Sequence, residues 1–254
     1  AIKLSADGAL GSRGAWLLEP YADAPDHAGL ATLPAGRVRA VATKALKVGF
    51  QVNTHAIGDR ANRVVLDELA EAFDAVPVAD HRFRIEHAQI LDPADIPRFA
   101  QLGVIASMQP VHQTSDRTMA EARLGPTRLK GAYAWKSLLT SGARLAFGSD
   151  TPVESPDPFA GLAAAITRED EKGEPFGGWQ PQERVSREEA LAGFTTGAAY
   201  AAFAESKVGR LAPGLWADFI LVDRDPMLAT PAELRATKVL ETWVAGRKVY
   251  SRPN

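Results

Sequence analysis

Three segments of this chain repeat one plan, in which a short apolar strand ends in a histidine or an aspartate and a turn or helix follows at once. Residues 50–60 carry His55, residues 83–87 end in His87, and residues 144–150 end in Asp150. Such strands are the repeating part of a (β/α) barrel, whose chemistry lies at the carboxyl ends of the strands. The pattern therefore predicts an α/β fold, and two histidines and one aspartate on successive strand ends suggest a metal site.

The number of repeats sets the predicted domain organisation. About five strand–helix units can be counted, three fewer than a closed barrel of eight needs, and residues 2–6 already form a strand. We therefore expect residues 1–208 to be a barrel portion that lacks its first strands. The last two strands of residues 209–254 form a predicted hairpin with no barrel-type helix after it, so this segment is expected to be a small β appendage. Because missing strands would leave sheet edges exposed, we expect a homo-oligomer.

Periodicity predicts the other elements. Helices are expected near residues 60–75, 92–102, 133–140 and 157–167, and a capping box at 186–189 is expected to open a helix over 190–203. Long irregular segments are expected at residues 8–34 and through residue 126 after Pro110, and these two loops would set the specificity of a pocket.

Charge and composition exclude several classes of function. The 29 basic and 31 acidic residues are interspersed and give a net charge of −2, so there is no basic surface for nucleic acid. No run of eighteen apolar residues exists, so no membrane span is expected. The chain has no cysteine, which leaves His, Asp, Glu and Lys as metal ligands and fits a cytoplasmic location.

The candidate ligands each have a simpler interpretation. A single strand-end histidine is more often hydrogen-bonded in the core, but the matching positions of His55 and His87 favour metal ligands. Asp150 could bind a metal and accept a proton from water, or it could cap the turn that follows Ser149. By its position alone, Lys3 could be an ordinary solvated lysine. A lysine that is desolvated on a barrel strand can instead react with carbon dioxide to form a carbamate.

Three further residues lie close in sequence to the predicted site. His112 follows a strand and could contact substrate, although a surface histidine is equally compatible with its position. Arg13, with Gly8 and Gly11, could form an anion-binding loop. Glu86 should face away from His87 by strand alternation, which favours a structural role.

Several motifs together resemble the amidohydrolase superfamily, in particular its branch of YtcJ-like and N-substituted formamide deformylase-like proteins. The matching segments are residues 3–13, 54–60, 84–89, 109–110, 148–153, 209–218 and 244–247. They occur in the family's order and extend over essentially the whole chain.

The resemblance implies a metal-dependent hydrolase with a (β/α)₈ barrel and a small β-sandwich. By motif, Lys3 would be the carboxylated bridging lysine, His55 and His87 would bind the more exposed metal, and Asp150 would bind metal and carry the proton. One or two divalent ions, most commonly zinc, would activate water to attack a non-peptide C–N bond of a small amide or formamide. Iron, manganese or nickel would accept the same ligands.

One motif of the family is absent from this sequence, and its absence leaves other functions possible. No two histidines are separated by a single residue, whereas the family carries a His-x-His pair on its first barrel strand. A non-catalytic relative or an inactive fragment with an assembly or binding role is the main alternative. A barrel enzyme of another chemistry, such as a lyase, is the third.

Overall fold

The computed structural model describes residues 1–253 of the chain. Its contacts divide the described residues into two units. Unit 1 comprises Ala1–Met108 and Ser115–Leu145, and unit 2 comprises Gln109–Thr114 and the chain from Ala146 onward. This division does not coincide with the boundary predicted at residue 209, which stays a prediction.

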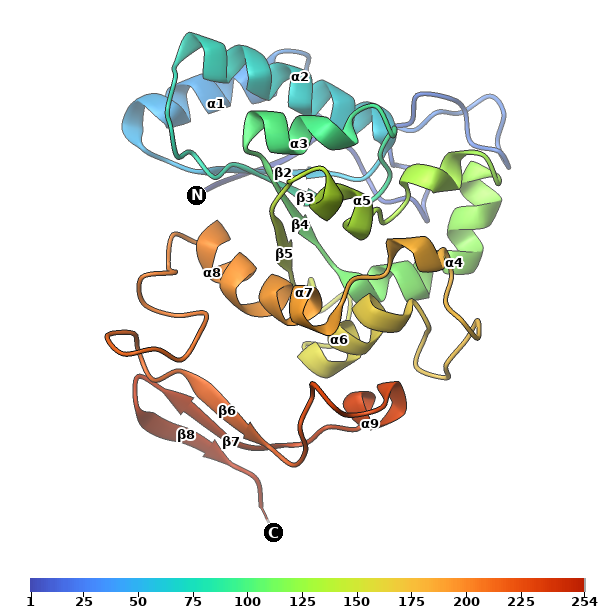
Figure 1. Ribbon diagram of the computed structural model, residues 1–254. Helices are drawn as coiled ribbons and strands as arrows, with labels where there is room; N and C mark the ends of the chain where they lie inside the picture. Colours follow the sequence, from blue (N-terminus) through green and yellow to red (C-terminus); the bar gives the residue numbers. More distant parts are fainter. Residues whose placement is uncertain (254) are drawn as a thin grey trace. The chain divides into compact units, whose positions relative to one another are not determined.

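Parallel strands form the centre of unit 1. In sheet order they are β1 (Ile2–Ser5), β2 (Val52–Ala56), β3 (Arg84–His87) and β4 (Ile105–Met108) (Figure 1). The fifth strand in this order, β5 (Leu145–Phe147), begins at the last residue of unit 1. The α/β class predicted from the strand endings is therefore confirmed.

Three helices lie together on one side of β2 and β3 (Figure 1): α1 (Arg37–Val48), α2 (Asp59–Ala75) and α3 (Ile96–Leu102). Their apolar residues recur at helical spacing, and in α2 the buried members include Val65, Leu66 and Leu69. The interiors of β2 and β3 contribute Val52 and Ile85, which are at most 1% exposed. Burial of these side chains is the main term that holds the helices to the sheet.

One of the two predicted loops is confirmed and the other is wrong. Residues 8–34 contain no helix or named strand, and they are anchored by buried Leu10, Leu17 and Tyr21. After Pro110, however, the chain forms α4 (Pro110–Leu124), followed by a 3₁₀ turn, η1 (Arg128–Gly131), and α5 (Trp135–Thr140). Proline is well suited to the first turn of a helix, and α4 is so polar that its apolar periodicity is hard to see.

Unit 2 contains α6 (Pro158–Thr167), a 3₁₀ turn, η2 (Pro181–Glu183), and α7 (Arg187–Ala192). The capping box predicted at the start of α7 is confirmed, because Ser186 and Glu189 exchange hydrogen bonds. The single helix expected over 190–203 is instead interrupted by a π-helical turn, η3 (Gly193–Gly197), before α8 (Ala198–Ala201). A Cβ on Gly193 would lie 2.4 Å from the Phe147 ring, so the glycine permits close packing there.

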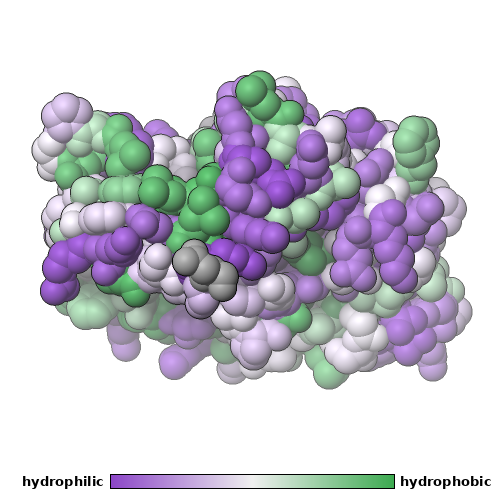
Figure 2. Space-filling view, turned by 90° about the horizontal axis from the view of Figure 1, so that it is seen from below, coloured by the Kyte–Doolittle hydropathy of each residue, from purple (hydrophilic) through white to green (hydrophobic). Residues whose placement is uncertain are grey.

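The β appendage is an antiparallel sheet of β6 (Phe219–Val222), β7 (Val239–Val244) and β8 (Arg247–Ser251), with α9 (Pro231–Arg235) between β6 and β7. The rings of Phe219 and Trp243 stack with centroids 5.5 Å apart. Seen from below, hydrophobic atoms lie at the surface among hydrophilic ones (Figure 2). Exposed apolar residues of this sheet include Ile220, Leu221, Leu240, Val249 and Tyr250.

Within residues 1–253 no helix has the length and apolarity needed to cross a membrane.

Candidate metal centre

Strand register places two of the predicted ligands on one face of the sheet. Ser5 of β1, His55 of β2 and Glu86 of β3 are register partners, and Lys3 lies two residues before Ser5. Because side chains alternate along a strand, Lys3 and His55 share a face. Lys3 is exposed, whereas the His55 side chain is only 18% exposed.

His87 reaches His55 because the backbone leaves the extended conformation at the end of β3. In register His87 pairs with Ala56, so regular alternation would point it away from His55. His87 and the following Ala88 instead have φ of 75° and 43°. The two imidazole rings then meet edge to face, with centroids 4.6 Å apart. A non-glycine residue in this region costs on the order of 1–3 kcal/mol, and such strain concentrates at functional sites.

Glu86 is held by its own strand. Its Oε1 accepts a hydrogen bond of 2.9 Å from Nε of Arg84, and Arg84 also donates to Oε1 of Gln51 at 3.3 Å. The ion pair agrees with the predicted structural role, although Glu86 shares its face of the sheet with His55.

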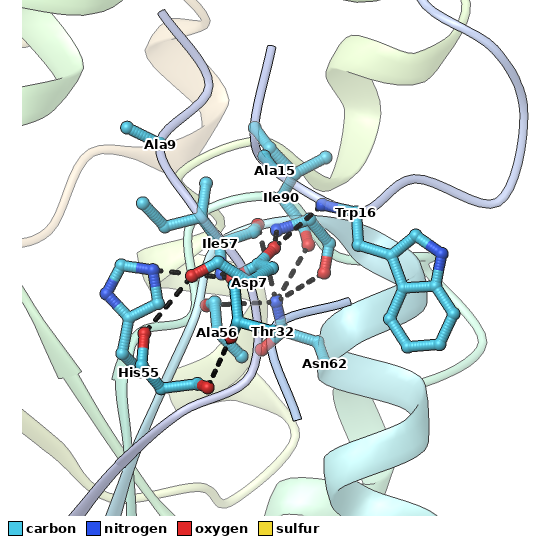
Figure 3. A network of polar contacts seen from close by, with 12 residues as sticks. Asp7, Ala9, Ala15, Trp16, Thr32, His55, Ala56, Ile57, Asn62 and Ile90 are labelled. Carbon is cyan, nitrogen blue, oxygen red and sulfur yellow. Dashed lines mark hydrogen bonds and ion pairs between the residues drawn. The ribbon is translucent and has the colours of Figure 1, made fainter. Parts of the chain in front are cut away.

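Asp7 was not among the predicted site residues, yet it lies at the centre of a polar network (Figure 3). Its side chain is fully buried. Oδ1 accepts the backbone N–H of Ile57 at 3.0 Å, and Oδ2 accepts those of Gly58 and Trp16, both at 2.8 Å. Oδ1 also lies 3.3 Å from Nε2 of His55. In the sequence, Asp7-Gly8 resembles an ordinary turn. Asp7 nevertheless follows a strand, and a polar residue at a strand end is the same signal that identified His55 and Asp150.

Asn62 of α2 holds the ends of β2 and β3 together. Its Nδ2 is within hydrogen-bonding distance of the carbonyl oxygens of Ala56 at 3.2 Å, Gly58 at 2.9 Å and Ile90 at 3.2 Å. Ile90 follows the strained end of β3, so this one fully buried amide fixes the segments that carry His55 and His87.

Gly58 allows the loop after β1 to approach the same place. A Cβ on Gly58 would lie 2.0 Å from the carbonyl oxygen of Trp16. That oxygen accepts the N–H groups of Arg60 and Ala61 in the first turn of α2, at 3.1 and 3.2 Å. The loop at 8–34 is thereby fixed beside His55.

Two further predicted residues lie in unit 2. His112 is in the first turn of α4, and Asp150 follows β5 with φ of 59°. Each offers a possible ligand atom, and these atoms are within 4.8 Å of each other. The turn after Asp150 is capped by Ser149, whose Oγ accepts from Thr151 N at 3.3 Å. This observation weakens the interpretation of Asp150 as a turn cap.

Arg13 is already paired. Its Nε and one terminal nitrogen donate to the two carboxylate oxygens of Asp23, at 3.1 and 2.9 Å. The hydrogen bond to Asp23 raises the pKa of Arg13, and the same bond lowers the pKa of Asp23. A substrate anion would have to compete with this carboxylate, and the substrate-binding role of Arg13 stays a prediction.

The side chains fit a divalent metal of the zinc type. Two imidazoles meet at adjacent strand ends in unit 1, and unit 2 contains an imidazole and a carboxylate in close proximity. Nitrogen and oxygen donors of this kind, without thiolates, bind zinc, iron, manganese or nickel.

Imidazoles and carboxylates at the carboxyl ends of parallel strands define an α/β protein with a candidate metal site. The chain belongs to the amidohydrolase family, whose sequence pattern matches residues 1–250.

Curated relatives extend over nearly the whole chain. Protein LONG AFTER FAR-RED 3 of Arabidopsis thaliana is 38% identical over 250 residues, which is 98% of this chain and 42% of the relative. Putative amidohydrolase YtcJ of Bacillus subtilis (strain 168) is 35% identical, with 99% and 47% covered. N-substituted formamide deformylase of Arthrobacter pascens is 30% identical, with 89% and 41% covered. The chain thus spans less than half the length of each of these relatives.

A solved structure agrees with the family. An uncharacterized metal-dependent hydrolase from Pyrococcus furiosus is 37% identical and superposes with a TM-score of 0.77, covering 89% of this chain and 45% of the other.

Proposed function

We propose that this chain is part of a metal-dependent amidohydrolase that hydrolyses a non-peptide C–N bond in a small amide or formamide. The observation that carries the proposal is the contact between the His55 and His87 rings at adjacent strand ends, with a strained backbone at His87. The similarity to N-substituted formamide deformylase supports the choice of bond.

The proposed ligands are Lys3, as a carbamate formed with carbon dioxide, together with His55, His87 and Asp150. Zinc is the proposed metal, with one or two ions bound. When bound, a divalent ion of this kind lowers the pKa of water and polarises a carbonyl group.

The side chains of the chain would carry the remaining steps. Asp150 would accept a proton from the attacking water and return it to the leaving nitrogen, so that the C–N bond breaks without releasing an amide anion. His112 and Arg13 are the proposed contacts of the substrate.

The proposal also covers the domain architecture, the oligomeric state and the cellular location of the protein. Residues 1–208 would belong to a (β/α)₈ barrel and residues 209–254 to a β-sandwich, in a homo-oligomer located in the cytoplasm. The parallel sheet and the antiparallel sheet of β6–β8 support the first two points.

The test uses the gene product that contains residues 1–254, purified without chelator. We expect about one or more equivalents of metal per chain by elemental analysis, and release of amine from a panel of amides and formamides. His55→Ala should remove most of the metal. Asp150→Asn should lower turnover by about 10²-fold or more, the usual contribution of a general acid–base group.

The control variant is His27→Gln, because the ring of His27 contacts the carbonyl oxygen of Arg13 rather than another imidazole. It should keep the metal. Metal that is bound normally in His55→Ala would refute the ligand assignment. Bound metal with no turnover on any C–N substrate would favour a non-catalytic member of the family.

A further inference from the structure

We propose that Asp7 is a positioning residue that holds the His55 imidazole in one tautomer, with Nε2 protonated toward Asp7 and Nδ1 left free to bind a metal. The tautomer of His55 follows from the contacts of its ring alone. Metal binding at Nδ1 rests on the proposed function.

The Asp7 carboxylate is fixed before it contacts His55. Its three backbone donors come from Trp16 in the loop after β1 and from Ile57 and Gly58 after β2. Each holds a carboxylate oxygen at 2.8–3.0 Å. A buried carboxylate held by several N–H groups has little freedom to turn, so it forms a rigid acceptor beside the ring.

The proton on His55 follows from the chemistry of its neighbour. An ionised carboxylate is an acceptor only, so a favourable contact at 3.3 Å requires Nε2 to be the donor. Nε2 is buried and has no hydrogen-bond partner, so the Asp7 carboxylate is the acceptor nearest to it. A neutral imidazole carries one N–H, and therefore Nδ1 keeps its lone pair.

The contact has the distance of an ion pair but lacks the angles of a hydrogen bond. The outer torsion of a histidine is broad, so a small rotation of the ring would align the N–H with the carboxylate. A carboxylate at this position fixes the tautomer and the orientation of a ligating histidine.

The first experiment needs no variant. In metal-free protein at about pH 8, ¹⁵N NMR of the imidazole nitrogens, assigned with His55→Gln, should show His55 as the Nε2–H tautomer. A ring that is mainly Nδ1–H would overturn the proposal, whether or not the protein binds metal.

The second experiment compares two buried aspartates. In Asp7→Asn the amide NH₂ must face a backbone N–H or the ring, because both carboxylate oxygens of Asp7 accept hydrogen bonds. Zinc affinity, measured by competition with a chelator, should fall about 10- to 100-fold, as for other partners of ligating histidines. The His55 tautomer should become mixed.

Asp59→Asn is the matched control. Asp59 is also buried and accepts two backbone N–H groups, but both bind Oδ1, so an amide can replace the carboxylate. Its zinc affinity and tautomer should match the wild type.

A cadmium-loaded sample separates this inference from the proposed function. Coupling between ¹¹³Cd and Nδ1 of His55 is expected. Coupling to Nε2 would overturn the role of Asp7 while leaving His55 a metal ligand. If Asp7→Asn does not fold, the tautomer of the wild-type ring and this coupling decide the question.

Discussion

Two buried aspartates show how the position of an oxygen decides what a carboxylate does. Asp7 uses both oxygens to join the loop after β1 to the end of β2. Asp59, the first residue of α2, uses one oxygen for the N–H groups of Leu18 and Arg60, at 2.8 and 2.9 Å. Burial is the largest influence on Asp59 and raises its pKa above the ordinary value, while the two hydrogen bonds oppose this effect.

Asp59→Asn should therefore change stability in a manner that depends on pH. A carboxyl whose pKa is higher in the folded state binds its proton more tightly there, so its contribution is most favourable below the unfolded pKa and is lost as pH rises through the folded pKa. The free energy of unfolding of Asp59→Asn, relative to that of wild type, should therefore increase from about pH 4 to about pH 7. At pH 7 the variant should be at most about 1 kcal/mol less stable than wild type, or more stable than wild type.

Urea unfolding at both pH values measures this difference. A variant that loses stability relative to wild type as pH rises would show that hydrogen bonds, rather than burial, dominate at Asp59.

The short helix α7 illustrates stability at the level of an element. It has only six residues before the π-helical turn, so its start matters more than its interior. Ser186 Oγ accepts from Glu189 N at 3.1 Å, and Glu189 Oε2 accepts from Ser186 N at 2.7 Å. The reciprocal bonds satisfy two of the backbone donors that a helix start leaves open.

Ser186→Ala should lower the free energy of unfolding by about 1 kcal/mol, the usual cost of losing an N-cap. Ser186→Thr retains the hydroxyl and should lose much less. Denaturant unfolding of both variants provides the comparison, and equal stability of the two would mean that the capping box contributes nothing measurable.

Elements were predictable where local chemistry is strong. The capping box at Ser186, the strand endings at His55 and His87, and the hairpin of β7 and β8 follow from short-range signals. The helix α4 was missed because it buries few of its side chains, among them Gln113, Ala120 and Leu124, and has no clear apolar stripe. Contacts with distant segments, rather than local pattern, specify such a helix.

At the scale of the whole molecule, acid should destabilise the fold through His81. Its ring stacks on Phe73 with centroids 3.9 Å apart, Nδ1 accepts the N–H of Phe83 at 3.0 Å, and Nε2 is 3.0 Å from the carbonyl oxygen of Leu102. Burial, the largest influence, lowers the pKa of His81. Protonation of Nδ1 would place its N–H against the backbone N–H of Phe83, and the hydrogen bond between them would be lost.

The stability contributed by neutral His81 is present above the unfolded pKa, about 6.5, and is lost as pH falls toward the lower folded pKa. His81→Phe should flatten the loss of stability in this window, even if it lowers stability overall. Phe73→Leu removes the stacking partner but keeps the titrating group, so a loss of stability toward low pH should persist in this variant. Thermal unfolding between about pH 5 and pH 8 tests both, and an unchanged slope in His81→Phe would contradict the assignment.

The class of fold and the histidines of the candidate site were accessible from sequence because they repeat at strand ends. Asp7 was not, because its role depends on three amides from residues 16, 57 and 58 that only the folded chain brings to it. The strained turn at His87 was likewise invisible, since strand alternation predicts the opposite orientation of its ring.

The network around Asp7 also has a consequence for the order of folding. Two of its amides are about fifty residues away along the chain, so their loop must close before the carboxylate is satisfied. Such closure costs entropy that local helix formation does not. In kinetic terms, α1 and α2 should gain protection from hydrogen exchange early, while the amides of Ile57 and Gly58 are protected only when β1 has joined β2.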